Sequence, residues 1–202
     1  MSVYGRIIDG TDVELAAESC LKFWINRYLA EVERQHDVTV GDYARPRSWK
    51  TANEMDRWPD DQLPAIIIIS TGLTGDRPTA EGDGSVRAPW GLGVAAVVSA
   101  NTFGNTRTLA LRYAAAIRAC LSQNQSLRRA LDGSVRGVTW LDERYNELPP
   151  EDGRTIMAAR LLFEVEVADV INVNTRPPEA EPEPEDWPTV EAVTNTQEVS
   201  GG

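Results

Sequence analysis

Residues that build reactive or metal-binding sites are scarce in this chain. Among 202 residues there are one histidine, His36, and two cysteines, Cys20 and Cys120. Two cysteines make no disulfide framework in a chain of this length, and a zinc site or a His-based triad would need to be assembled around the single histidine. Each cysteine lies on the apolar side of a predicted helix, where a free thiol usually acts as a small buried hydrophobe. The sequence therefore predicts a protein of a reducing cytoplasm, with no metal and no cofactor.

Long apolar runs and clustered basic residues are also missing. No stretch approaches the roughly 20 apolar residues that cross a bilayer, and no basic segment followed by an apolar one opens the chain. We therefore expect neither a signal peptide nor a membrane-embedded segment. The 20 basic residues include only two lysines, Lys22 and Lys50, and the arginines are scattered along the chain. Without a basic stripe to neutralise phosphates, sequence-specific nucleic-acid binding is not expected.

The negative charge of the chain, formally −11, is concentrated near its C-terminal end. Seven of the 31 acidic residues and none of the 20 basic ones lie after Arg176, so residues 1–176 carry about −4. The stretch Pro177-Pro-Glu-Ala-Glu-Pro-Glu-Pro-Glu-Asp186 has too little apolar surface to offset the entropy lost on ordering. The sequence therefore predicts a folded domain at 1–176 and an acidic, Pro/Glu-rich extension at 177–202 that is disordered or extended.

Apolar periodicity predicts an α/β domain. Helical spacing and capping residues favour helices at 12–34, where Thr11 or Asp12 can act as the cap, and at 103–123, capped by Asn101 or Thr102. Strands are predicted at 63–70, 90–100, 135–142 and 155–173, with a hairpin loop at 146–153 joining the last two. The apolar, β-branched run at 63–70 is typical of a central strand covered on both faces. We expect a single-domain sandwich in which an N-terminal helix and a β-β-α-β-β unit form a mostly antiparallel sheet packed by helices.

Two charged segments are candidate partner-contact sites. The first is a predicted loop at 71–89, which is longer than compact domains usually keep and contains Asp76, Arg77, Asp83 and Arg87. The second is the predicted strand near 161–167, where Leu161, Phe163, Val165 and Val167 alternate with Glu164 and Glu166. We expect the two glutamates to lie on an outer strand and to meet arginines of the second helix of a neighbouring copy.

Motifs that would indicate catalysis are weak. Residues 91–96 (Gly-Leu-Gly-Val-Ala-Ala) match the G-x-G-x-x-A dinucleotide pattern, but that pattern needs a helix opening at the glycines, whereas a β-branched run follows here. Asp76, Glu81 and Asp83 carry oxygen ligands, yet their spacing lacks the density of a dedicated calcium loop. The sequence therefore predicts no catalytic residue, and the chain is expected not to be an enzyme.

Four segments together resemble a known family. They are Leu63-Pro-Ala-Ile-Ile-Ile-Ile-Ser-Thr-Gly72, Trp90-Gly-Leu-Gly-Val-Ala-Ala-Val-Val98, Leu111-Arg-Tyr-Ala-Ala-Ala-Ile-Arg-Ala-Cys-Leu121 and Leu161-Leu-Phe-Glu-Val-Glu-Val-Ala-Asp-Val-Ile-Asn172. In order and character they resemble the tail terminator proteins of long-tailed phages, particularly those that infect actinobacteria. The resemblance spans roughly residues 1–174, and the preference for arginine over lysine is typical of a GC-rich host genome.

The resemblance implies a structural virion protein without chemistry of its own. Such a subunit forms a hexameric ring with copies of itself on the last ring of the major tail tube protein, stops tube growth, and offers the surface to which the head–tail connector or stopper protein docks. DNA would pass through the lumen without specific binding. The protein would be assembled in the bacterial cytoplasm and would reside in the virion at the junction of tail and neck. The alternatives are another neck component, namely a stopper or head-completion protein, and a nucleotide-binding α/β enzyme.

Overall fold

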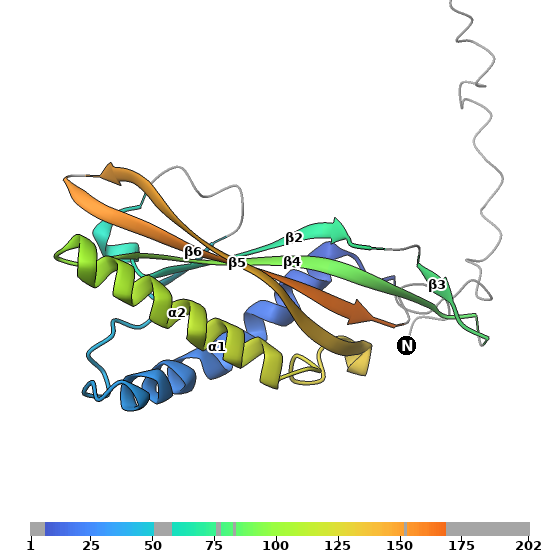
Figure 1. The fold of residues 1–202 in the computed structure, drawn as a ribbon. Coiled ribbons are helices and arrows are strands. Elements are labelled where there is room, and N and C mark those ends of the chain that lie inside the picture. Colours follow the sequence, from blue (N-terminus) through green and yellow to red (C-terminus); the bar gives the residue numbers. More distant parts are fainter. Residues whose placement is uncertain (1–6, 51–57, 76–77, 83, 152, 169–202) are drawn as a thin grey trace, which may run out of the picture.

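The computed structural model describes residues 7–50, 58–75, 78–82, 84–151 and 153–168 as two helices against one mixed sheet. Figure 1 shows the helices α1 and α2 together on one side of the sheet. The helices are α1 (Gly10–Gln35) and α2 (Phe103–Gln123), with short 3-10 turns at Asp60–Gln62 and Leu131–Gly133. The strands are β1 (Ser48–Lys50), β2 (Ala65–Leu73), β3 (Thr79–Ala80), β4 (Val86–Ser99), β5 (Val135–Glu151) and β6 (Arg154–Val167).

The sheet has the order β1-β2-β4-β6-β5, and β3 pairs with β4. Every pair is antiparallel except β1 with β2, which is parallel. The expected α/β single domain, with an N-terminal helix and a mostly antiparallel sheet packed by helices, is therefore confirmed. The acidic extension at 177–202 and the expected strand residues after Ala168 lie outside the described residues.

Both helices begin at side-chain caps. Asp9 caps α1, since its Oδ1 accepts hydrogen bonds from the backbone N–H of Thr11 at 2.8 Å and of Asp12 at 3.1 Å, and Asp12 Oδ2 accepts from the Asp9 N–H in return. The predicted cap at Thr11 or Asp12 was therefore wrong by two or three residues. Thr102 caps α2 through a bond from the Asn105 N–H, as predicted. Each cap satisfies backbone donors that the helix itself cannot pair.

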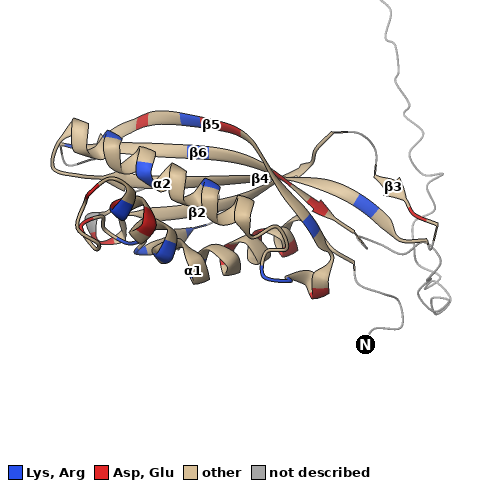
Figure 2. Ribbon diagram, turned by 60° about the horizontal axis from the view of Figure 1, so that its bottom comes forward, with Lys and Arg blue, Asp and Glu red and all other residues tan. Residues whose placement is uncertain are grey.

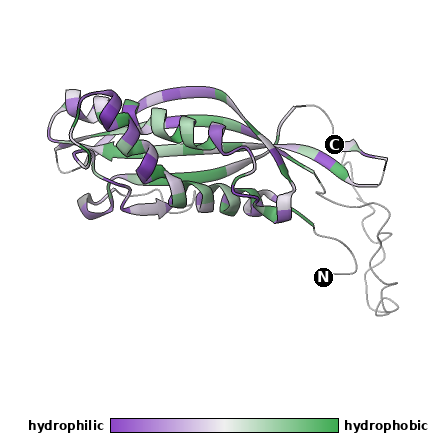
Figure 3. Cartoon of the chain, turned by 90° about the horizontal axis from the view of Figure 1, so that it is seen from below, coloured by the Kyte–Doolittle hydropathy of each residue, from purple (hydrophilic) through white to green (hydrophobic). Residues whose placement is uncertain are grey.

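The main hydrophobic core lies between the helices and the sheet. Its largest fully buried side chains come from both layers: Leu21, Ile25 and Leu29 of α1, Tyr113 and Ile117 of α2, and Ile66, Leu92 and Phe163 of the strands. Figure 3 shows hydrophobic residues along the strands that the helices cover. A smaller apolar cluster lies on the opposite face of the sheet around Trp58, Leu63 and Ile67. Strand β2 thus has apolar contacts on both faces, as its continuous apolar run predicted.

Strands extend into two predicted loops. Strand β2 continues to Leu73 through a register shift between Ser70 and Gly72, and about half of the predicted loop at 71–89 belongs to β2, β3 and β4. Strand β5 likewise continues to Glu151 through a shift between Leu148 and Glu151, where the hairpin loop at 146–153 was expected. In both places the strand pairing has an irregular register, which accommodates glycine or proline residues that disfavour a regular ladder of backbone hydrogen bonds.

A buried carboxylate fixes the chain after α1. The Glu33 side chain is fully buried and accepts hydrogen bonds from the backbone N–H of Gly41 at 3.0 Å and of Tyr43 at 2.7 Å. It also pairs with the Arg45 guanidinium at 2.5 Å. The Tyr113 hydroxyl donates to the Ala44 carbonyl oxygen at 2.6 Å, which ties the same segment to α2. The segment 41–45 is therefore held by side chains of both helices.

The protonation of Glu33 links this segment to pH. Burial tends to raise the pKa of the carboxyl group, but Arg45 and the backbone N–H groups of Tyr43 and Gly41 lower it, and the net shift is downward. The folded pKa of Glu33 lies below the unfolded value of about 4.3, so the stabilisation that ionised Glu33 gives the folded protein is fully present above the unfolded value. It is lost as the pH falls through the folded pKa.

We expect Glu33→Gln to lower the free energy of unfolding by about 3 kcal/mol at pH 7, because Arg45 would lose its carboxylate. The control is Glu31→Gln, which removes an exposed pair with Arg34 and should cost less than about 1 kcal/mol. Urea unfolding at pH 7 and pH 3 measures both. The difference between wild type and Glu33→Gln should shrink at pH 3, and an equal difference at the two pH values would contradict the assignment.

Candidate interaction surfaces

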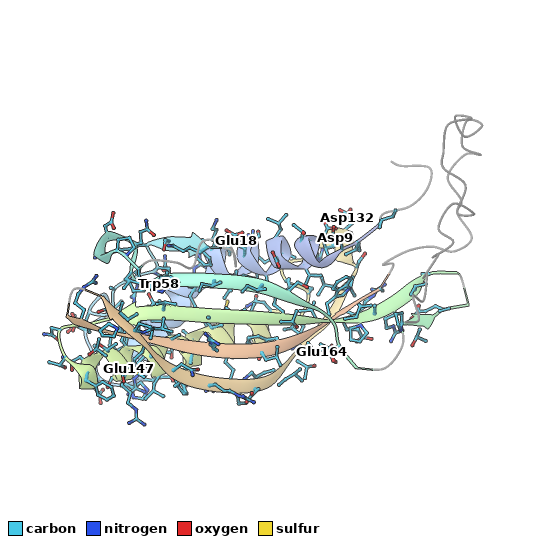
Figure 4. All side chains as sticks on the ribbon, turned by 90° about the horizontal axis from the view of Figure 1, so that it is seen from above. Asp9, Glu18, Trp58, Asp132, Glu147 and Glu164 are labelled. Carbon is cyan, nitrogen blue, oxygen red and sulfur yellow. The ribbon has the colours of Figure 1, made fainter. Side chains whose placement is uncertain are left out.

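The face of the sheet opposite the helices carries an apolar hollow. Its volume is about 470 Å³, and its walls come from β2, β4, β6, the end of β5 and the segment before β2. Figure 4 views the molecule from this side, with Trp58 beside β2. The lining residues are mostly apolar and include Trp58, Ile67, Ile69, Ala95, Leu148 and Ala158. We call this surface the outer hollow.

A group of charged residues lies on the same strands towards their other end. Arg87 of β4 pairs with Glu166 of β6 at 2.9 Å and also with Glu81. Glu164 accepts a hydrogen bond from the Thr74 hydroxyl at 2.8 Å. We call Arg87, Glu164 and Glu166 the charged strip. Figure 4 places Glu164 well away from Trp58, so the charged strip and the outer hollow occupy different parts of the sheet.

Three of the six predicted contact residues therefore come together in the structure. Arg87 and Glu166 pair across β4 and β6, and Glu164 lies two residues from Glu166 on the same face of β6, while Asp76, Arg77 and Asp83 lie outside the described residues. The sequence did not single out Thr74 and Glu81 as partners of the strip. Residues two apart along a strand share a face, so the sequence predicted that Glu164 and Glu166 lie on the same face. Arg87 is brought to this face by the pairing of β4 with β6, which the sequence alone does not show.

The expected contact between these glutamates and arginines of α2 has a weaker basis in the structure. Strand β6 lies between β4 and β5, so the description of it as an outer strand was wrong. On α2, Arg118 pairs with Glu143 of β5 at 2.7 Å and lies 4.9 Å from the centre of the Trp140 ring. The Nη1 atom of Arg112 lies 2.6 Å from Nε2 of the exposed His36. The two glutamates of β6 and the arginines Arg112 and Arg118 of α2 thus have partners within their own chain.

The two edges of the sheet differ. Strand β5 forms one edge over 17 residues and leaves Trp140, Leu141 and Tyr145 between 37% and 48% exposed. A register shift between Trp140 and Asp142 interrupts it. At the other edge, within the part of the chain that the structure describes, β1 pairs with Ala65–Ile67 of β2, and farther along the Ser70 N–H donates to Glu14 of α1 at 2.6 Å. Figure 2 shows acidic and basic residues alternating along β5 and several basic residues on α2.

The glycines of the dinucleotide-like pattern lie inside β4. Gly91 and Gly93 are paired with β2 on one side and β6 on the other, so no helix opens at them. A Cβ atom on Gly91 would meet Thr71 Oγ1 at 2.1 Å and Thr74 Cγ2 at 2.7 Å, whereas one on Gly93 would meet its neighbours at 3.6 Å or more. The close approach of two threonines at the β2 register shift explains the glycine at position 91.

The two cysteines lie in the core, as predicted. Cys20 of α1 and Cys120 of α2 are both free and fully buried, and a hydrogen bond links them across the helix pair. This bond and the burial raise the pKa of Cys120. A thiol in such surroundings is protonated and unreactive. Within the described ranges no three His, Cys, Asp or Glu side chains gather into a possible metal site.

None of the helices in the described part of the chain combines the length and apolar composition needed to cross a bilayer. No protein-family model matches the sequence, and no curated protein matches it.

We expect Gly91→Ala to lower the free energy of unfolding by about 1–3 kcal/mol, because the added methyl group overlaps Thr71 and Thr74. Gly93→Ala is the matched control and should cost less, since its new contacts are ordinary ones. Adding Thr71→Ala to Gly91→Ala should recover part of the loss. Thermal and urea unfolding measure all three variants. Equal losses at the two glycines would contradict a steric role specific to Gly91.

Proposed function

We propose that this chain is a structural subunit that caps a phage tail tube as a ring, stops tube growth and offers the surface on which the head docks. The observation that carries the proposal is the order of elements. The four segments on which the family resemblance rests correspond to β2, β4, α2 and β6. In the fold they form the centre of the sheet and the helix that packs on it.

The described surfaces suit contacts of more than one kind. Closed rings need two different patches on each subunit, one for each neighbour, and a cap needs further patches for the tube and the head. One face of the sheet carries the apolar outer hollow and the charged strip, whereas the basic residues of α2 lie on the helical side. We propose that the outer hollow receives an apolar side chain of a neighbouring subunit and that the charged strip meets the tube.

The charge of the chain also fits a subunit that lines a passage for DNA. A net charge of −11 repels a phosphate backbone. Several of the described arginines are in ion pairs or cation–π contacts, as Arg45, Arg87 and Arg118 illustrate. DNA could therefore pass such a ring without being held by it.

A phage that lacks this gene should still form tubes, but they should grow beyond the normal length, because polymerisation belongs to the tube protein. Electron microscopy of lysates measures tube length. Purified protein added afterwards should cap tubes without shortening them. Tubes of normal length that fail to join heads would instead indicate a stopper or head-completion protein, and normal virions would overturn both assignments.

Glu164→Gln together with Glu166→Gln should weaken binding to purified tail tubes by at least tenfold, because the variant removes two charges of the charged strip. Exposed ion pairs contribute little to folding, so the melting temperature should change by only a few degrees. Glu147→Gln, at an exposed position on β5, is the control and should bind normally. Co-sedimentation with tubes measures the affinity, and unchanged binding of the double variant would exclude the charged strip from the contact.

A further inference from the structure

A second hollow lies on the helical side of the molecule, on the other side of the sheet from the outer hollow. It has a volume of about 470 Å³ and is formed by the exposed side of α1 and by one residue that follows α2. Its lining residues are Leu15, Glu18, Ser19, Lys22, Phe23 and Arg128. We call it the α1 hollow. Leu15 is 58% exposed and Phe23 is 47% exposed, which is unusual for apolar side chains on a helix that packs on a core.

Cations surround the apolar floor of the α1 hollow. The guanidinium of Arg128 lies 3.7 Å from the centre of the Phe23 ring, and that of Arg27 lies 5.7 Å from it. Lys22 adds a third positive charge, paired at 2.5 Å with the partly exposed Glu18. Arg129 follows Arg128 and is exposed. Among the lining groups Glu18 is the single acid, so the hollow combines an exposed aromatic ring with an excess of positive charge.

The turn that presents Arg128 has an unusual backbone. Leu127, Arg128 and Arg129 have φ angles of 44°, 64° and 58°, a left-handed conformation that residues other than glycine rarely adopt three times in succession. The turn is nevertheless held firmly, because Leu127 is buried and the Gln125 side chain exchanges two hydrogen bonds with the backbone of Val138 in β5. Strained backbone that its surroundings hold in place is typical of functional positions.

The described chain ends close to this turn. The backbone N–H of Ala168 donates to the Ser134 carbonyl oxygen at 2.8 Å, and Ser134 follows Arg128 by six residues. Residues 169–202 continue from that point. An extended chain covers up to roughly 3.5 Å per residue, so Glu179 and all residues beyond it can reach any part of the α1 hollow.

We propose that the acidic run at 179–187 of this chain docks in its own α1 hollow. The run contains Glu179, Glu181, Glu183, Glu185 and Asp186, followed by Trp187, and no basic residue occurs after Arg176. Carboxylates of the run pair with Lys22 and Arg128, and the Trp187 indole packs on Leu15 and Phe23. Attachment to the same chain keeps the local concentration of the run high, so weak contacts suffice.

Carbodiimide cross-linking of the full-length protein tests this docking, because the reagent joins a lysine amine to a carboxylate in contact with it. The chain has only two lysines, Lys22 and Lys50, and trypsin, which does not cut the Arg176–Pro177 bond, releases 161–202 as one peptide. Mass spectrometry should find this peptide joined to Lys22 in the monomer, and fragmentation should place the link at a carboxylate of 179–186. The yield should fall at least fivefold between 50 mM and 500 mM salt, since exposed charges are screened.

Variants of the full-length protein give the decisive comparison. Arg128→Glu keeps Lys22 but should lower the yield at least fivefold, and Trp187→Ala should lower it as well. Arg107→Glu, an equal charge change at an exposed position of α2, should leave it unchanged. Circular dichroism verifies that each variant is folded. Equal yields in Arg128→Glu and wild type would overturn the proposal. In a mixture of isotopically heavy and light protein, cross-links found only between different chains would also overturn it.

Discussion

The packing of two helices on a single face of the sheet is the constraint on which the rest of the molecule depends. Successive side chains of a strand point to opposite faces, so covering one face commits every second residue of β2, β4 and β6 to the core. Phe163 and Val165 are buried beneath the helices, and their neighbours Glu164 and Leu162 turn to the other side. The strands that build the core therefore also build the outer hollow and the charged strip.

The same constraint explains why polar side chains around the helices hold the connecting segments by hydrogen bonds. The helix pair leaves the segments that connect it to the sheet exposed, and these are fixed by a few hydrogen bonds to helical side chains. Glu33 holds 41–45, and Gln125 holds the turn after α2 against β5. Such bonds add little net stability when exposed, but a buried and fully paired carboxylate determines a single conformation of the backbone around it.

The sequence predicted the elements whose signal is local. Alternation at 161–167 predicted both the strand and its buried side, and Thr102 marked the start of α2. It did not predict the strands at 71–89 and 146–153, because glycine and proline there indicate loops unless the partner strand is known. The candidate site was only partly predictable for the same reason. Glu164 and Glu166 find their partners Thr74 and Arg87 across 90 and 79 residues of sequence.

The hydrogen bond from Ser70 to Glu14 has a consequence for the solubility of the protein. An uncovered strand edge can recruit another strand, and repeated recruitment leads to fibrous aggregates. On one edge the Glu14 carboxylate of α1 accepts the hydrogen bond of the Ser70 N–H, and the described residues of β1 pair with three residues of β2 beside it. At the opposite edge the interrupted register at Leu141 breaks the regular spacing of β5. The sheet edges of neighbouring molecules are therefore poorly matched for edge-to-edge strand pairing. Contacts between side-chain surfaces are left to determine how copies of the chain associate.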